Sequence, residues 1–372
     1  AETPPEADIV IGGPPCQGFS ALGKQAQLDE RNQLWLRYAE TIRKSNPKYF
    51  VLENVPQFLT TIQLTRIKRQ CQPSQPLGAY TFQAKVLNAA DYGTAQIRKR
   101  VIVIGHHRDL LFPGFPTTTH AKFADNCHEG WRTLGNVLDG LRRAVTDIDL
   151  PRREIEVSGT VLPGAFKTSE LHLTRHYEQI SIDRFRSIPA DGNRFDIPEY
   201  LLPECWKNHM TGSGDVMGRL NFNKPSVTIR TEFFKPEKGR YLHPTAHRAL
   251  THHEAARIQG FPDDYKWVGS KVAIARQIGN AVPIPLAQAI GAHLARLLCE
   301  SAYSVAKTRQ ARARPTFVHD AGPESSRDRP CGRCPAALDP CQIFAFPSSA
   351  SVARDPFKTG RTHAVGARWR RA

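Results

Sequence analysis

Ile9-Val10-Ile11-Gly12-Gly13-Pro14-Pro15-Cys16-Gln17-Gly18-Phe19-Ser20 is the stretch that decides the fold of this chain. Its apolar start predicts a buried strand over residues 7–13, which leads directly into a Gly-Gly-Pro-Pro turn. Prolines fix backbone angles and glycines remove side-chain bulk, so the turn presents Cys16 on a rigid loop. Open α/β sheets bind ligands at the carboxyl ends of their strands, and Cys16 is expected there as a nucleophile. The alternative is a buried cysteine in a tight turn, because free cysteine is often buried.

Composition predicts a globular cytoplasmic protein. The 372-residue chain is 40% hydrophobic, and none of its apolar runs approaches the ~20 residues that span a bilayer. Residues 1–8 are polar and acidic, unlike a signal peptide. The eight cysteines are scattered through a long chain without an export signal, which favours reduced thiols over disulfides. Cys16 is therefore expected to be free to react.

The net charge of +16 suggests a polyanionic partner. Residues 302–372 hold 13 Lys or Arg against 5 Asp or Glu, a net charge of +8, so half of the excess lies in the tail. The remaining excess is weak support for nucleic-acid binding, because many proteins that never touch nucleic acid carry as much.

Residues 1–112 alternate between strand and helix patterns. Strands are expected at residues 7–13, 49–55, 81–87 and 100–105, with an amphipathic helix over residues 33–44. This order predicts the α/β class, as a doubly wound, mostly parallel sheet covered by helices.

Three further regions follow this catalytic region. Residues 113–245 lose periodicity and form a second, irregular domain. Residues 246–301 are expected to return to the sheet with two helices, the first beginning with a Thr251 and Glu254 capping box and the second near residue 283. Residues 302–372 form a basic tail predicted to lack regular structure.

A cysteine pair and a glycine-rich run resemble ligand sites, but each lacks a feature that such a site needs. Cys331 and Cys334 have the spacing of zinc ligands, but only Cys341 follows nearby, so no metal is expected. The glycine-rich run at residues 212–218 lacks the preceding strand and the spacing of a nucleotide loop, so a flexible loop is expected.

Charged residues are expected around Cys16. Glu53 ends the next strand and would lie beside Cys16 if the two strands are neighbours, although a solvated glutamate at a strand end is the alternative. Arg98 and Arg100 alternate onto one face of a strand, where two guanidinium groups would form an anion clamp and favour the thiolate. A solvated basic strand edge is the commoner meaning of such a cluster.

Five short motifs occur in the order found in the DNA (cytosine-5)-methyltransferases, which this chain resembles over residues 8 to about 296. The motifs are the Pro-Pro-Cys turn at residues 14–16, Glu-Asn-Val at residues 53–55, Gln-x-Arg-x-Arg at residues 96–100, Arg-Ile-Gln-Gly-Phe-Pro at residues 257–262 and Gln-Ile-Gly-Asn-Ala-Val-Pro at residues 277–283. The resemblance implies a class I, Rossmann-like methyltransferase domain and a target-recognition region at residues 113–245.

The resemblance also implies roles for individual residues. Cys16 would be the nucleophile, Glu53 the partner of cytosine nitrogen 3, and Arg98 and Arg100 the organisers of the base pocket. The methyl donor would be S-adenosylmethionine, bordered by Pro14, Pro15, Asn280 and Val282. Double-stranded DNA would contact Ser20, Lys24, Arg31, Gln96 and Arg257. Arg257 would also brace the irregular domain, and residues 21–32 would close over a flipped cytosine.

The family normally begins with a strand and a Gly-rich loop for the cofactor, and this chain begins beyond both. We therefore expect a protein lacking its amino-terminal portion, either a fragment or one half of a split enzyme whose partner is a separate chain. The resemblance implies the modification enzyme of a bacterial restriction-modification system, associated with the nucleoid and functionally paired with a cognate endonuclease.

Three alternatives were considered. One is methylation of RNA cytosine, which the Gln-Gly-Phe-Ser continuation after Cys16 disfavours. Another is a catalytically inactive DNA-binding remnant, because the first cofactor elements are missing. A cysteine hydrolase fits poorly, since no histidine lies in a motif that would pair it with Cys16.

Overall fold

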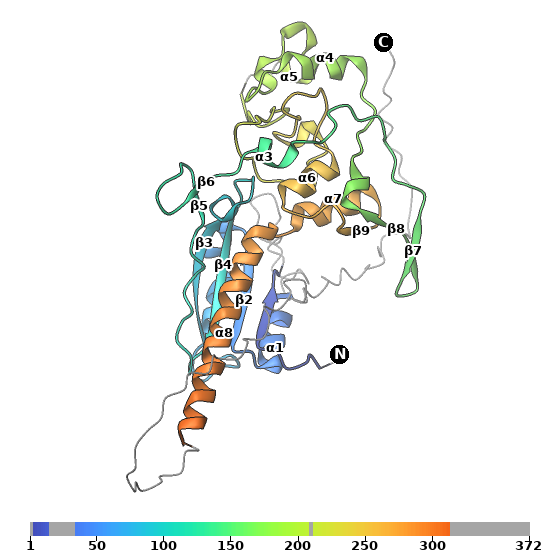
Figure 1. Ribbon diagram of the computed structural model, residues 1–372. Helices are drawn as coiled ribbons and strands as arrows, with labels where there is room; N and C mark the ends of the chain where they lie inside the picture. The colour runs from blue at the N-terminus through green and yellow to red at the C-terminus, as the bar shows by residue number, and fades with distance from the viewer. Residues whose placement is uncertain (1–2, 15–33, 208–210, 313–372) are drawn as a thin grey trace, which may run out of the picture. The chain divides into compact units, whose positions relative to one another are not determined.

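The central sheet has four strands in the spatial order β1-β2-β4-β3 (Figure 1). Their bounds are β1 (Ile9–Gly12), β2 (Tyr49–Asn54), β3 (Tyr80–Asn88) and β4 (Lys99–His107). β1 pairs with β2 in parallel, and β4 lies antiparallel to both β2 and β3. β1, β2 and β3 therefore run in one direction and β4 is reversed, because a parallel crossover needs a dozen or more residues and only residues 89–98 connect β3 to β4. The predicted α/β class with a largely parallel sheet is confirmed.

The computed structural model describes residues 3–14, 34–207 and 211–312. These residues all belong to one compact unit that spans residues 1–322. The tail beyond residue 312, with Cys331, Cys334 and Cys341, lies outside the described residues.

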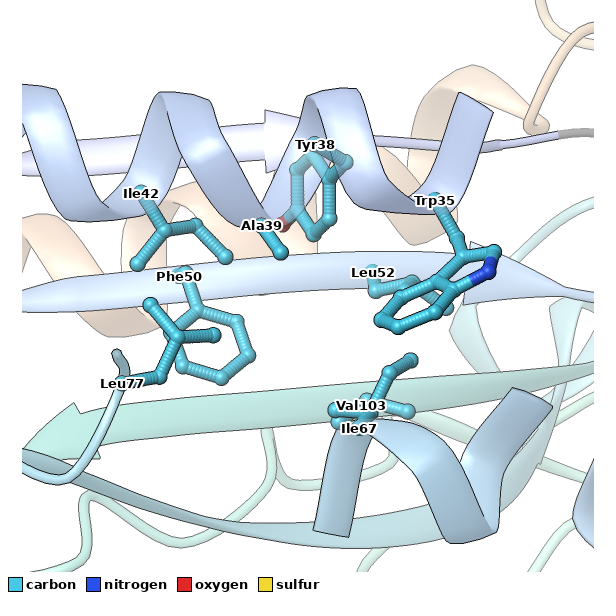
Figure 2. Close-up of a pocket in the computed structure, with 9 residues that line it drawn as sticks. All are labelled: Trp35, Tyr38, Ala39, Ile42, Phe50, Leu52, Ile67, Leu77 and Val103. Carbon is cyan, nitrogen blue, oxygen red and sulfur yellow. The ribbon is translucent and has the colours of Figure 1, made fainter. Parts of the chain in front are cut away.

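Alternating side chains of β2 bury both faces of the sheet, as expected for a central strand. Phe50 and Leu52 pack in an apolar cluster with α1 (Leu34–Ser45) and α2 (Ile62–Gln70). Tyr49 and Val51 pack on the opposite face with α8 (Ile284–Arg312). A cavity of about 10 Å³ remains beneath α1, which is about the space of one water molecule (Figure 2). Its apolar lining identifies it as a packing defect rather than a ligand site.

β1 is less buried than the sequence predicted. Ile11 is 53% exposed, because β1 is the outermost strand of the sheet among the described residues. The expectation of a fully buried strand is therefore wrong.

A second apolar cluster lies within residues 134–278. Two short strands precede this part of the chain, β5 (His120–Ala121) and β6 (Glu129–Gly130). The helices and strands within it are α3 (Leu134–Leu138), β7 (Glu154–Val157), β8 (Thr160–Lys167), α4 (Gln179–Ser187), α5 (Glu204–Lys207), α6 (His252–Ile258), β9 (Lys266–Val268) and α7 (Lys271–Asn280). We call residues 134–280 the recognition module, after the target-recognition region that the sequence resemblance leads us to expect in this part of the chain. It contains more regular structure than the sequence indicated, because its elements are short.

The return to the sheet occurs later than residue 246, where the sequence placed it. β9 pairs with β8, and α6 and α7 bury their apolar side chains in the cluster of the recognition module. Of the three helices α6, α7 and α8, it is α8 that packs on the sheet, through Leu286, Ile290 and Leu294. Tertiary pairing with β8, which the sequence pattern cannot reveal, decides this boundary.

The predicted helix ends are confirmed in part. Thr251 caps α6 and forms the expected capping box with Glu254. α8 continues to Arg312, so the prediction of a tail without regular structure is wrong for residues 302–312. A helix already anchored on the sheet propagates at little cost through good helix formers.

No single helix among the described residues is long and apolar enough to cross a membrane. α7 and the first part of α8, residues 284–300, meet the length and composition test only as a pair bent by 47°.

Two buried histidines make the stability of the recognition module depend on pH. Burial lowers the pKa of His243 and of His252 to about 4, so both are neutral in the folded protein at pH 7. His252 Nε2 lies 2.9 Å from the Lys271 carbonyl oxygen, and the ring stacks on Phe234.

We expect the free energy of unfolding to fall as pH drops from about 6.5 to about 4. In this range the two histidines are protonated in the unfolded chain but stay neutral in the folded protein, because their pKa values are lower there. Each histidine contributes a slope of at most about 1.4 kcal/mol per pH unit. Denaturant titrations at several pH values measure the slope, and His252→Gln should reduce it. An unchanged slope in this variant would contradict the assignment.

Candidate active site

The carboxyl ends of β1 and β2 lie side by side. Gly12 pairs with Leu52 in the parallel register, so the turn after β1 meets the end of β2. Asn54 Nδ2 donates to the Pro14 carbonyl oxygen at 2.9 Å, and a Cβ on Gly13 would lie 3.4 Å from Glu53 Oε2. The start of the Pro-Pro-Cys turn and Glu53 are therefore neighbours, as the strand order predicted.

Glu53 forms an ion pair with the reversed strand β4. Its Oε1 atom lies 2.9 Å from Arg100 Nε, and the two side chains are 20% and 14% exposed. Burial raises the pKa of Glu53 above its usual value, although the charges of Arg100 and Arg98 oppose this shift. The carboxyl group therefore holds a proton more readily than an ordinary glutamate, while Arg100 fixes its orientation.

Arg98 has a different environment from Arg100. It is 2% exposed, and its Nη1 and Nη2 atoms donate to the carbonyl oxygens of Ile229 and Gly279, both at 2.8 Å. Both terminal nitrogens are thus committed to backbone groups. Only Arg100 lies against Glu53, whereas Arg98 is buried, so a joint anion clamp of Arg98 and Arg100 stays a prediction.

Gln96 is also buried, with 0% exposure. Its Nε2 donates to Gln259 Oε1 at 2.8 Å, and its Oε1 accepts from the Ile229 backbone N–H at 2.8 Å. Both polar atoms of the side chain are therefore bonded within the protein, and its contact with DNA stays a prediction.

Arg257 braces the recognition module. Its Nε and Nη2 atoms both contact the Asp263 carboxylate, and its Nη1 donates to the Val137 carbonyl oxygen at 3.4 Å. The hydrogen bond from Arg257 is the largest cause that holds the pKa of Asp263 well below its usual range. The predicted bracing role fits these contacts, whereas contact with DNA would require Arg257 to leave Asp263.

Asn280 is the last residue of α7, and Val282 lies between α7 and α8. Asn280 is exposed, and Val282 packs against the same apolar cluster as Ile9 of β1. The preceding Gly279 lies so close to residues 230–231 that a Cβ would be 2.5 Å from the Thr231 nitrogen. Glycine is therefore required at this position.

Several predicted site residues lie outside the described residues, namely Pro15, Cys16, Ser20, Lys24 and Arg31. The glycine-rich run is described from residue 211 and forms a turn, in which Gly218 N donates to the Asp215 carbonyl oxygen at 3.0 Å. Among the residues that the structure describes, no cluster of three His, Cys, Asp or Glu side chains could hold a metal ion.

Sequence reasoning missed two residues that build the site. Asn54, within the Glu-Asn-Val motif, joins the turn after β1 to β2 through its side-chain amide. Gly279, within the motif at residues 277–283, supplies one of the carbonyl oxygens that hold Arg98. Both lie inside motifs already singled out, but only the folded chain shows what they contact.

Arg257→Met tests whether this arginine contacts DNA. We expect the free energy of unfolding to fall by at most about 1 kcal/mol, because the pair with Asp263 is partly exposed. The slope of the logarithm of DNA affinity against the logarithm of salt concentration should stay unchanged. Loss of a phosphate contact would instead reduce this slope by about 1. Asp263→Asn is the matched variant and should cause a similar loss of stability.

Comparisons with known proteins agree with this geometry. The family model of C-5 cytosine-specific DNA methylases matches residues 1–296. The type II methyltransferase M1.HphI of Haemophilus parahaemolyticus is 32% identical over 290 residues, which cover 77% of this chain and 67% of that protein. The type II methyltransferase M.NgoFVII of Neisseria gonorrhoeae is 33% identical over 285 residues, covering 76% and 67%.

The fold also matches a solved structure, described as a DNA modification methyltransferase encoded within a prophage (E. coli). The TM-score is 0.56 at 22% identity, and the match covers 78% of this chain and 79% of the other. With the Glu53 carboxyl group held by Arg100 at the end of β2 and a family model spanning both the sheet and the recognition module, the chain belongs to the C-5 cytosine-specific DNA methylases.

Proposed function

We propose that this protein transfers a methyl group from S-adenosylmethionine to carbon 5 of a cytosine that has been swung out of duplex DNA, with Cys16 as the nucleophile. The observation that carries the proposal is the Glu53–Arg100 pair beside the turn at Pro14. Only Pro15 separates Pro14 from Cys16, so two residue-to-residue steps join them, and each step spans at most about 3.6 Å. Covalent geometry thus keeps the Cα atom of Cys16 within roughly 7 Å of that of Pro14.

The chemistry needs a nucleophile and an acid at the same ring. Carbon 5 of cytosine is not nucleophilic while the ring is aromatic, so the Cys16 thiolate first forms a bond to carbon 6. The electron pair displaced by this bond moves toward nitrogen 3, where a hydrogen bond or proton from Glu53 neutralises it. Carbon 5 then becomes an enamine carbon that can attack an electrophilic methyl group.

Glu53 suits this acidic role for a physical reason. Burial favours its neutral form, and the charges of Arg100 and Arg98 keep that preference moderate. Arg100 holds one carboxyl oxygen, which leaves the other to face the base. After methylation, carbon 5 gives its proton to water, nitrogen 3 returns its proton to Glu53, the carbon–sulfur bond breaks and the thiolate is regenerated.

S-adenosylmethionine would supply a methyl group on a sulfonium ion, which is a strong electrophile. Pro14, Pro15, Asn280 and Val282 would border it. Two observations support a cofactor site beside Val282 and Asn280. Val282 and Ile9 of β1 pack against the same apolar cluster, and Asn280, two residues before Val282, is exposed.

We further propose that the recognition module reads a specific duplex site and that Ser20, Lys24 and Arg31 contact the DNA around the flipped base. A cytosine cannot react while it is stacked, so binding must also offset a few kcal/mol of unstacking. A cognate endonuclease would be a functional partner, as is usual for a modification enzyme.

Trapping with 5-fluorocytosine tests the covalent step. The substrate is a long duplex of varied sequence, so that it includes the recognition sequence, and every cytosine in it carries fluorine at carbon 5. Fluorine cannot leave carbon 5 as a proton does. With S-adenosylmethionine present, we expect an adduct that survives denaturing electrophoresis. Cys16→Ser should abolish the adduct while DNA retention remains. Retention by the unaltered chain without an adduct would support a binding protein without catalysis, and preference for RNA would support the RNA alternative.

Glu53→Gln tests the acid. We expect a bell-shaped dependence of the single-turnover rate on pH for the unaltered protein, because the reaction needs a thiolate and a protonated carboxyl group together. The variant should react about 100-fold or more slowly, and its rate should rise with pH to a plateau, because only the thiol still titrates. Glu129→Gln, an exposed carboxyl group on β6, should keep the bell shape. A bell-shaped profile in Glu53→Gln would exclude Glu53 as the acid.

A further inference from the structure

The segment just before β4, residues 95–98, is held by the recognition module. Ile97 N donates to the Ser226 carbonyl oxygen at 2.8 Å, and Ser226 N donates to that of Ala95 at 2.9 Å. Thr228 Oγ1 donates to the Ile97 carbonyl oxygen at 2.9 Å. The end of this segment lies two residues before Arg100, so the module is attached immediately next to the Glu53–Arg100 pair.

Arg98 makes the longest of these connections in sequence. Its side chain reaches Ile229, 131 residues away, and Gly279, 181 residues away. It forms no ion pair with any described residue, although it is almost fully buried. Burial, with a smaller effect from Arg100, lowers its pKa to about 9, so Arg98 still carries its charge at neutral pH. The two carbonyl oxygens compensate that charge.

The backbone of Arg98 is fixed to the sheet as firmly as its side chain is to the module. Its N–H donates to Asn88 Oδ1 at 3.1 Å, and its carbonyl oxygen accepts from Ala89 N at 3.0 Å, both at the end of β3. A displacement of Ile229 or Gly279 therefore acts on a residue that is covalently next to β4. Arg100 and the Glu53 carboxyl group are the next side chains to move.

We propose that Arg98 is a positioning residue that couples the recognition module, through Arg100, to the orientation of the Glu53 carboxyl group. It does not touch the base. Seating of DNA on the module then sets the geometry of the acid, which matters because a displacement of about 1 Å in an active site can cost about 100-fold in rate. The inference rests on the proposed function for the roles of Glu53 and Arg100.

A double-mutant cycle tests this coupling. Arg98→Lys keeps a positive charge but cannot hold both carbonyl oxygens, and Arg100→Lys weakens the hold on Glu53. We expect each variant to lower the single-turnover methylation rate by about 10- to 100-fold, and the double variant to be no slower than Arg100→Lys alone. Rates that multiply in the double variant would mean that Arg98 acts independently of Arg100, and would overturn the proposal.

Arg219→Lys provides the matched control. Arg219 is also buried and also bonds only to backbone carbonyl oxygens, those of Phe185, Ile188, His243 and Ala246, but within the recognition module. It should lower the melting temperature while leaving the pH profile unchanged. Arg98→Lys should shift the pH profile, because the charge of Arg98 lowers the pKa of Glu53 and the shorter lysine would place that charge elsewhere. A profile shifted equally by both variants would indicate general destabilisation and contradict the proposal.

Hydrogen exchange on the full chain separates failure of this inference from failure of the proposed function. If no fluorocytosine adduct forms, the proposed function fails, but exchange can still be measured. Arg98→Lys should lower protection at residues 226–229 and also at residues 53–54 of β2. Loss of protection confined to residues 226–229 would show that the module and Glu53 are not coupled.

Discussion

Parallel pairing of β1 with β2 is the constraint on which the site depends. Both strands end at the same edge of the sheet, so the turn after β1 and the Glu-Asn-Val segment after β2 meet there. The Asn54 amide then ties β2 to the Pro14 carbonyl oxygen, and Glu53 lies against Arg100 and next to Gly13. A one-residue slip in this register would turn Glu53 to the other face of the sheet.

Burial and charge act in opposite directions at this edge. Desolvation favours a protonated Glu53, and the nearby guanidinium groups favour its ionised form. Arg100 lies in the reversed strand β4 and Arg98 directly precedes that strand, but the two arginines have different partners. Arg100 contacts the carboxyl group, whereas Arg98 is consumed by backbone carbonyl oxygens of the recognition module. One strand therefore both holds the acid and connects it to the part of the chain proposed to read DNA.

Much of the architecture was predictable, and the failures have identifiable causes. Strand and helix periodicity located β1, β2, β3, β4, α1 and α8, because each buries a regular apolar face. The extent of the recognition module was not predictable, since β9 joins it by pairing with β8 about 100 residues earlier in the chain. The family resemblance implied contact with DNA for Gln96 and with the base pocket for Arg98, and it could not reveal that their amide and guanidinium groups satisfy buried backbone groups.

The sequence by itself determined the family, the α/β class and the candidate chemistry at Cys16 and Glu53, because these depend on short motifs and their order. Only the tertiary structure decided which charged side chains face the site and which ones hold the two cores together. The reason is that the same guanidinium group can bind a carboxylate, a phosphate or a carbonyl oxygen. Neighbours brought together from positions more than 100 residues apart determine which of these it meets.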